Sequence, residues 1–157
     1  MKKFELTSEF VTNISGTKLF RIKALVEFGD VEAGELGGYI EKEENLDHDG
    51  DAWVSGDAWV SGDAQVSGDA WVYGNARVSG DAWVCGDADY AYAHGFGSVN
   101  RTTTFFRFKN GNVGVVCGCF HGTLQEFRDK IRETHGETKK AQEYLMLADL
   151  MDFRFKN

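Results

Sequence analysis

Between Gly50 and Ala88 the chain alternates apolar and polar residues in a unit of six, written G-[DN]-A-x-V-x. Within each unit an Ala and a Val flank one variable residue, as in Ala52-Trp53-Val54. Because side chains alternate between the two faces of a strand, Ala and Val share one face and the variable residue takes the other. The unit therefore predicts a short strand with Ala and Val inside, followed by a Gly-Asp corner in which glycine accepts unusual backbone angles.

Units of this kind stack into a solenoid in which each coil covers the next. The unit resembles the hexapeptide repeat of left-handed parallel β-helices, a family known from acyltransferases, in which three units close a triangular coil of about 18 residues. The resemblance implies that residues one coil apart lie over one another. This sets Trp53 over Trp71, Trp59 over Arg77 and Gln65 over Trp83.

Charge and pattern divide the chain of 157 residues into three parts. Residues 1–96 carry 7 Lys/Arg against 18 Asp/Glu, whereas residues 97–157 carry 10 against 7. Such an asymmetry indicates separate modules. We therefore expect a mainly β protein with an N-terminal β cap (1–34), a short left-handed parallel β-helix (35–96) and a C-terminal α+β module (97–157).

Turn and capping signals predict the elements of the two flanking modules. The alternating runs FELTSEFVTNI and KLFRIKALVEF indicate a hairpin that turns near residue 15. In the C-terminal module, TTTFFRF and NVGVVCGCF indicate a second hairpin around residues 109–112. A capping box opens a helix over about 123–136, and a second helix follows over about 138–152.

The flanks resemble a narrower group of proteins. The stretches GELGGYIEKEENLDHDGDAWV, VVCGCFHGTLQEF and ETHGETKKAQEYL are similar to hypothetical proteins of bacteriophages and prophages. In that group a short hexapeptide β-helix joins a small C-terminal module. The resemblance implies the fold, a viral origin and a location in the cytoplasm of an infected bacterial host, but no common activity.

Composition excludes several function classes. The net charge of −8 disfavours general binding to nucleic acid or to anionic membranes. No run approaches the roughly 18 apolar residues of a membrane span, and the N-terminus MKKFELTSEF lacks the apolar core of a signal peptide. The three cysteines form no disulfide framework, which fits a reducing cytoplasm. We expect Cys117 and Cys119 to act as small buried hydrophobes.

The four tryptophans of the repeat occupy outward positions and require a cover, because large exposed apolar surface marks contact sites. The cover expected first is a homotrimer with parallel axes, as in the acyltransferase family. A flanking module that folds back, or a flat ligand stacked on Trp with Arg77 beside its anionic group, are the alternatives. The candidate interface or ligand-binding residues are Trp53, Trp59, Trp71, Tyr73, Arg77, Trp83, His94, Arg101 and Arg107.

The sequence supplies little equipment for catalysis. Acyltransferases of this fold use a His as general base, and His48, His94 and His121 are the candidates. However, the repeat is short and lacks an inserted loop that would build an acceptor pocket, so we assign no catalytic residue. No His pair has the close spacing of a zinc site, and turn chemistry explains the corner Asp residues. We expect neither metal nor cofactor.

These observations favour a phage-encoded, non-enzymatic binding protein. In one specific version it acts against host defence by sequestering a nucleotide-type immune signal, a small anionic ligand, at subunit interfaces. A structural or protein-interaction oligomer is one alternative, in which the tryptophans are only buried. An acyltransferase-like enzyme that uses coenzyme A is the other.

Overall fold

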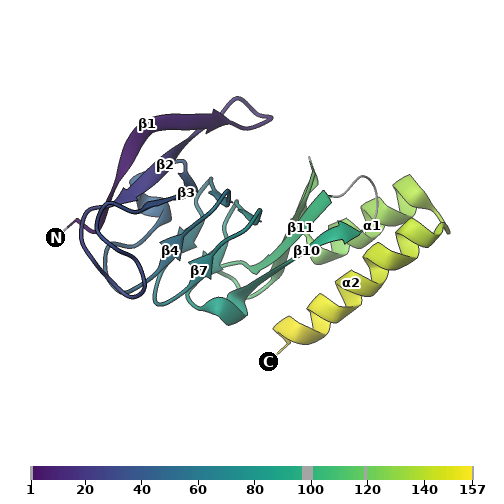
Figure 1. Cartoon of the computed structure of the whole chain (residues 1–157). Helices are drawn as coiled ribbons and strands as arrows, with labels where there is room; N and C mark the ends of the chain where they lie inside the picture. Colours follow the sequence, from purple (N-terminus) through teal and green to yellow (C-terminus); the bar gives the residue numbers. More distant parts are fainter. Residues whose placement is uncertain (1, 97–100, 119, 157) are drawn as a thin grey trace.

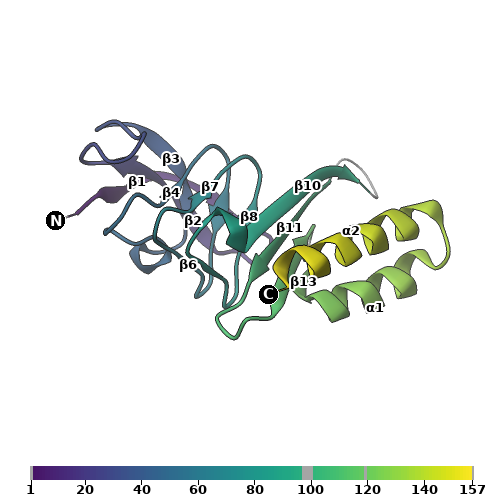
Figure 2. The ribbon, with the colours of Figure 1, turned by 90° about the horizontal axis from the view of Figure 1, so that it is seen from below.

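The computed structural model describes residues 2–96, 101–118 and 120–156. They form three layers, which are a solenoid with an N-terminal hairpin, an antiparallel sheet and a pair of helices (Figure 1). Seen from below, the two helices lie side by side on the face of the sheet that points away from the solenoid (Figure 2).

Six strands of two residues each build the solenoid. They are β4 (Trp53–Val54), β5 (Trp59–Val60), β6 (Gln65–Val66), β7 (Trp71–Val72), β8 (Arg77–Val78) and β9 (Trp83–Val84). They pair in parallel as β4 with β7, β5 with β8 and β6 with β9, so the three stacked pairs predicted for one coil are confirmed. The corners turn at glycines in the left-handed region, such as Gly56 with φ 61°. Each corner closes by a backbone bond, as from Ala58 N to Ser55 O at 3.3 Å.

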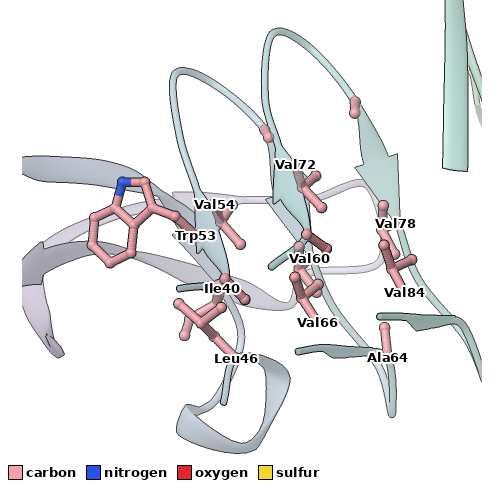
Figure 3. Packing of buried hydrophobic residues seen from close by; sticks show 14 of the residues in the cluster. Ile40, Leu46, Trp53, Val54, Val60, Ala64, Val66, Val72, Val78 and Val84 are labelled. Carbon is pink, nitrogen blue, oxygen red and sulfur yellow. The ribbon is translucent and has the colours of Figure 1, made fainter. Parts of the chain in front are cut away.

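The interior of the solenoid contains the side chains that the six-residue unit predicts. The valines of the six strands point inward and are each at most 1 % exposed (Figure 3). The alanines of the same units are also buried. Trp53 points the other way, toward the N-terminal segment (Figure 3). Small and branched side chains alternate along the interior, which lets the coils pack closely on one another.

The N-terminal hairpin extends one side of the solenoid. Strands β1 (Phe4–Thr12) and β2 (Lys18–Ala24) pair antiparallel, and the predicted turn is confirmed by Gly16 at φ 86°. Strand β2 pairs with β3 (Leu36–Ile40), which runs parallel to β5. The result is one five-stranded sheet in the order β1-β2-β3-β5-β8. The short helix η1 (Glu43–Asn45) follows β3 along the chain.

A buried lysine closes the first coil. Lys3 is 3 % exposed, and its Nζ donates to the carbonyls of Gly50 at 3.3 Å and Ala52 at 2.7 Å. Its ammonium also lies 4.5 Å from the centre of the Phe28 ring. Burial lowers the pKa of Lys3, and nearby carboxylates, of which Asp47 acts most strongly, work in the opposite direction. The lysine thus satisfies carbonyls that have no preceding coil to pair with.

The C-terminal module begins with the short helix η2 (Asp87–Asp89). Its sheet comprises β10 (Tyr90–Phe96), β11 (Arg101–Arg107), β12 (Val113–Cys117) and β13 (Phe120–Thr123), all antiparallel. Although β10 lies in the range 35–96, it pairs with β11 and not with a coil. The helices α1 (Leu124–His135) and α2 (Lys139–Phe155) follow. The predicted capping box is confirmed: Thr123 Oγ1 accepts from Glu126 N at 3.1 Å, and the Glu126 carboxylate accepts from Thr123 N at 2.9 Å.

The two faces of this sheet pack against two different hydrophobic cores. Phe106 belongs to the core of the solenoid, whereas Phe105 belongs to the core under the helices. The edge of the last coil is bonded to the module: Arg77 N donates to Thr104 Oγ1 at 2.9 Å, and Lys109 N donates to Asp81 O at 3.0 Å. The module therefore caps an end of the solenoid that would otherwise expose unpaired backbone.

Candidate functional site

The four tryptophans have different surroundings. Trp53 is 0 % exposed, because the N-terminal segment covers it. The rings of Phe28 and Trp53 meet in a T-shaped arrangement with their centroids 5.3 Å apart. Gly37 packs so closely on the indole that an added Cβ would lie 2.7 Å from it. Its Nε1 is buried and has no hydrogen-bond partner among the described residues. The cover of this tryptophan is thus the chain's own flanking module and not a second copy.

Three other predicted residues lie outside the row formed by Trp59 and Arg77. Trp71 is partly buried, and its carbonyl accepts from the Tyr90 hydroxyl. Tyr73 is 49 % exposed and meets the ring of Tyr92 edge-on at 5.7 Å. Trp83 is 42 % exposed, with Lys109 Nζ 5.9 Å from its ring centre. None of these three residues lines the cleft that contains Trp59 and Arg77.

Trp59 and Arg77 belong to a ladder of side chains on the outer face of the five-stranded sheet. Arg21 of β2 lies opposite Tyr39 of β3, Tyr39 opposite Trp59, and Trp59 opposite Arg77. The guanidinium of Arg21 lies 4.5 Å from the centre of the Tyr39 ring, and that of Arg77 lies 4.1 Å from the centre of Trp59. We call these four residues the cation–aromatic ladder. At these distances each guanidinium is attracted to the face of the ring over which it lies.

The arginines at the two ends of the ladder differ in whether a carboxylate pairs with them. Arg21 Nε donates to Glu9 at 2.6 Å, and the Tyr39 hydroxyl donates to the same carboxylate at 3.1 Å. These bonds, that of Arg21 first, lower the pKa of Glu9 from its ordinary value. At the other end, no carboxylate of a described side chain lies within ion-pair distance of Arg77. One end of the ladder is neutralised and the other remains positive.

Backbone carbonyls hold the Arg77 side chain in place. Its Nη1 donates to the carbonyls of Asp57 at 2.9 Å, Asn75 at 3.0 Å and Ala76 at 3.3 Å. Burial lowers the pKa of Arg77, and the charge of Asp57 partly opposes this effect. A guanidinium stays charged at neutral pH even so. Within the described structure its Nε and Nη2 make no hydrogen bond, so they are available to an acceptor from outside.

Trp59 and Arg77 line a cleft of about 520 Å³. Three parts of the chain bound it: the turn of the N-terminal hairpin at residues 12–15, the outer face of the solenoid, and the C-terminal sheet. The sheet contributes Phe106, Phe120 and His121, among others. A cleft of several hundred Å³ with apolar walls and few polar groups is typical of small-molecule sites. Trp59 provides an aromatic ring and Arg77 a positive charge, and Ser61 and Ser79 also line the cleft.

The predicted basic residues of the C-terminal module lie elsewhere. Arg107 Nε pairs with Asp89 at 3.0 Å, and its Nη1 donates to the carbonyl of Phe155 at 2.9 Å. It therefore joins η2 to the end of α2. His94 is exposed, with its Nδ1 2.8 Å from Thr102 Oγ1. The side chain of Arg101 lies outside the described part of the structure.

The candidate histidines and cysteines also lie in different places, and His121 is the one among those described that lines the cleft. His48 stacks on Phe4 at 4.2 Å, and its Nδ1 accepts from Lys3 N at 3.0 Å, so it has a structural role. Cys117 is buried as predicted, whereas Cys119 lies outside the described residues. In the described ranges no three His, Cys, Asp or Glu side chains come together as a metal site would require.

Most of the cleft could not be predicted from the sequence. Trp59 and Arg77 were candidates for the interface or ligand, and His121 was a candidate base. The hairpin turn, the sheet residues around Phe106, and Tyr39 and Arg21 of the ladder were not predicted to belong to a site. A signal for Tyr39 existed in the spacing of the chain. Tyr39 precedes Trp59 by one coil plus two residues, and it lies directly beside Trp59 in the row of outward side chains. No local pattern places the hairpin turn over this row, since its contact partners lie far along the chain.

The comparison with known families identifies the repeat. Residues 70–86 match the YdcK beta solenoid repeat. The matched segment comprises β7, β8 and β9 and the corners between them, so a β-solenoid repeat is established independently of the strand pairing. No curated protein matches the chain. Within the described ranges, no helix combines the length and the apolar character that crossing a membrane requires.

Proposed function

We propose that this protein is a non-enzymatic binding protein whose cleft holds a small ligand with a flat ring and an anionic group. The single observation that carries the proposal is Arg77, a partly buried guanidinium that lies over the ring of Trp59 without a carboxylate within ion-pair distance in the described structure. The net charge of the chain is −8, so carboxylates are abundant, yet none of the described ones pairs with this cation. A partly buried charge without a partner costs free energy. A bound anion would compensate it, and Trp59 would stack on the ring of the same ligand.

A nucleotide combines these two features, a base with a π-face and a phosphate. We therefore keep the specific version in which a phage-encoded protein sequesters a nucleotide-type signal of host defence. The cleft lies within one chain, so capture does not require a subunit interface. Left-handed winding, phage origin, the homotrimer and the cytoplasm of an infected host stay predictions that rest on the resemblance of the repeat and flanks.

The first test is binding of a defined panel of mononucleotides and cyclic dinucleotides, measured by native mass spectrometry and calorimetry on the intact protein. We expect at least one member of the panel to bind. Stacking on an aromatic ring contributes about 1–3 kcal/mol per base, so Trp59→Leu should weaken binding by roughly 5- to 150-fold. Arg77→Gln should weaken it by at least about tenfold, because an ion-assisted contact is lost.

The chain offers a matched control for both variants. Trp83 and Lys109 form another aromatic–cation pair on a solenoid side outside the cleft, so Trp83→Leu should leave affinity unchanged. Melting temperatures of all variants would show that the fold persists. If no nucleotide binds, or if Trp83→Leu lowers affinity as much as Trp59→Leu, the cleft is not the site.

His121 motivates a second candidate function. It lies in the same cleft and is exposed, as a general base would be. An acyltransferase-like enzyme would bind coenzyme A there and lose turnover in the variant His121→Ala. A binding protein would keep its affinity for the nucleotide in that variant and show no transfer of an acetyl group.

A further inference from the structure

The outer surface of α2 differs from every other helical surface described here. Met146, Leu150 and Phe153 are 70 %, 55 % and 78 % exposed. Their spacing of four and three residues places them on one face of the helix, in a continuous row. We call these three residues the α2 stripe. It lies opposite the buried face of the helix, which contains Ala141, Tyr144, Ala148, Met151 and Phe155.

Helix α1 shows what an ordinary surface helix of this protein looks like. It lies beside α2 in the same layer (Figure 2). Its buried face is apolar, and its exposed positions are all polar: Gln125, Glu126, Asp129, Lys130, Arg132, Glu133 and Thr134. A helix that is apolar on two opposite faces is normally buried on both. The stripe therefore indicates a surface that another protein covers.

Charges on one flank of the stripe indicate which protein this is. Glu143 and Arg154 lie on the same flank, about three turns apart, near the two ends of the stripe. Neither forms an ion pair with a described residue of its own chain. In contrast, the carboxylates on the other flank, Asp149 and Asp152, are held by Arg128 at 2.9 and 3.6 Å.

A second α2 in antiparallel orientation matches this arrangement. The point halfway between Met146 and Phe153 lies within about one residue, or ~1.5 Å of helix rise, of the point halfway between Glu143 and Arg154. A two-fold axis there sets Met146 against Phe153 of the second copy and Leu150 near its own equivalent. The same axis brings Glu143 of each chain toward Arg154 of the other. A surface that complements itself in this way is what an isologous dimer requires.

We propose that the protein self-associates through the α2 stripe, as an antiparallel pair of α2 helices from two copies. The stripe lies on the exposed side of α2, and none of its residues lines the cleft, so this association does not depend on ligand binding. Helix α2 itself covers the face of the C-terminal sheet that points away from the solenoid (Figure 1). If the solenoids also assemble into trimers, α2 pairing would join two such trimers. In either case, loss of the pairing halves the mass of the assembly.

The test is the mass of the intact protein in solution, measured by light scattering after gel filtration and by analytical ultracentrifugation. We expect Leu150→Asp to halve the mass, because two carboxylates would face each other across the axis. Leu36→Asp is the matched control, since Leu36 is 53 % exposed on β3, far from α2, and its variant should keep the full mass. A monomeric wild-type protein at about 100 μM, or a mass that Leu150→Asp leaves unchanged, would overturn the proposal.

Charge reversal separates a second copy from a different partner. Glu143→Arg and Arg154→Glu should each raise the dissociation constant of the assembly. The double variant should restore association, because the complementary charges then face each other again with exchanged signs. If each single variant associates as tightly as the wild type, or if the double variant remains dissociated, the antiparallel arrangement is wrong.

Discussion

At the scale of single residues, the corner glycines determine how closely the coils stack. Six of them, from Gly50 to Gly80, have φ between 61° and 75°, which L side chains rarely adopt. Their surroundings are not equal. A Cβ on Gly68 would collide with the carbonyl oxygen of Cys85, whereas a Cβ on Gly56 would meet Gly74 at 3.5 Å, an ordinary contact. The two positions share a backbone conformation and differ in the distance to the next coil.

We predict that Gly56→Ala lowers the free energy of unfolding by about 1–2 kcal/mol, the usual effect of a left-handed alanine. Gly68→Ala should lower it by a further 1–3 kcal/mol or so, because the carbonyl of the next coil must move. Urea unfolding of both variants measures the difference. Equal losses would mean that the backbone conformation alone, and not the close approach of coils, requires glycine at these corners.

At the scale of elements, the N-terminal hairpin is held on the solenoid by polar contacts as well as by strand pairing. Arg21 of β2 donates to Glu9 of β1 and, through Nη1, to the carbonyl of Gly37 in β3 at 2.7 Å. The hairpin also carries the turn that bounds the cleft. Contacts between β1, β2 and β3 thus position one wall of the candidate site.

The lowered pKa of Glu9 predicts a pH dependence with a definite sign. Because its pKa is lower in the folded chain than in the unfolded one, its contribution to stability is present at neutral pH and is lost in acid. We expect Glu9→Gln to be less stable than the wild type at pH 7, with the gap closing between about pH 5 and 3. Glu27→Gln, which removes an exposed carboxyl outside any described ion pair, should show no such gap in thermal unfolding.

At the scale of the whole molecule, the side chain of Arg107 connects three elements that are distant along the chain. From β11 it pairs with Asp89 of η2 and donates to the carbonyl of Phe155 at the end of α2. Its guanidinium also lies 5.2 Å from the centre of the Phe155 ring. Arg107, one of the residues predicted to bind a ligand, is thus positioned to connect β11 with η2 and α2.

We predict that Arg107→Met lowers the free energy of unfolding by about 1–3 kcal/mol, because charged hydrogen bonds are lost while the apolar stem is kept. Nucleotide affinity should not change. Arg132→Met is the control, since the Arg132 side chain is exposed and its one ion pair within the described residues is with Asp129 at 3.8 Å. This variant should change stability by less than about 0.5 kcal/mol. If the folded Arg107→Met variant binds the ligand more weakly than the wild type, Arg107 contributes to ligand binding after all.

The sequence by itself determined the features that depend on local pattern. The six-residue unit specified which side chains fill the solenoid. The three units per coil of the family that the repeat resembles then predicted that Trp59 lies beside Arg77. The hairpin turn at Gly16 and the capping box at Thr123 followed from short-range hydrogen bonding and backbone angles. Such features involve residues close in sequence, so one chain is sufficient to predict them.

Only the tertiary structure decided which outward residues are covered and by what. Trp53 and Trp83 occupy equivalent places in the unit, yet one is 0 % and the other 42 % exposed. The difference arises because β3 and Phe28 reach the first coil and not the last. The cleft likewise joins residues 12–15, the row of Trp59 and the strand of Phe106, which no periodicity relates. Packing between distant segments depends on where whole elements lie, and a repeat of six residues carries no information about that.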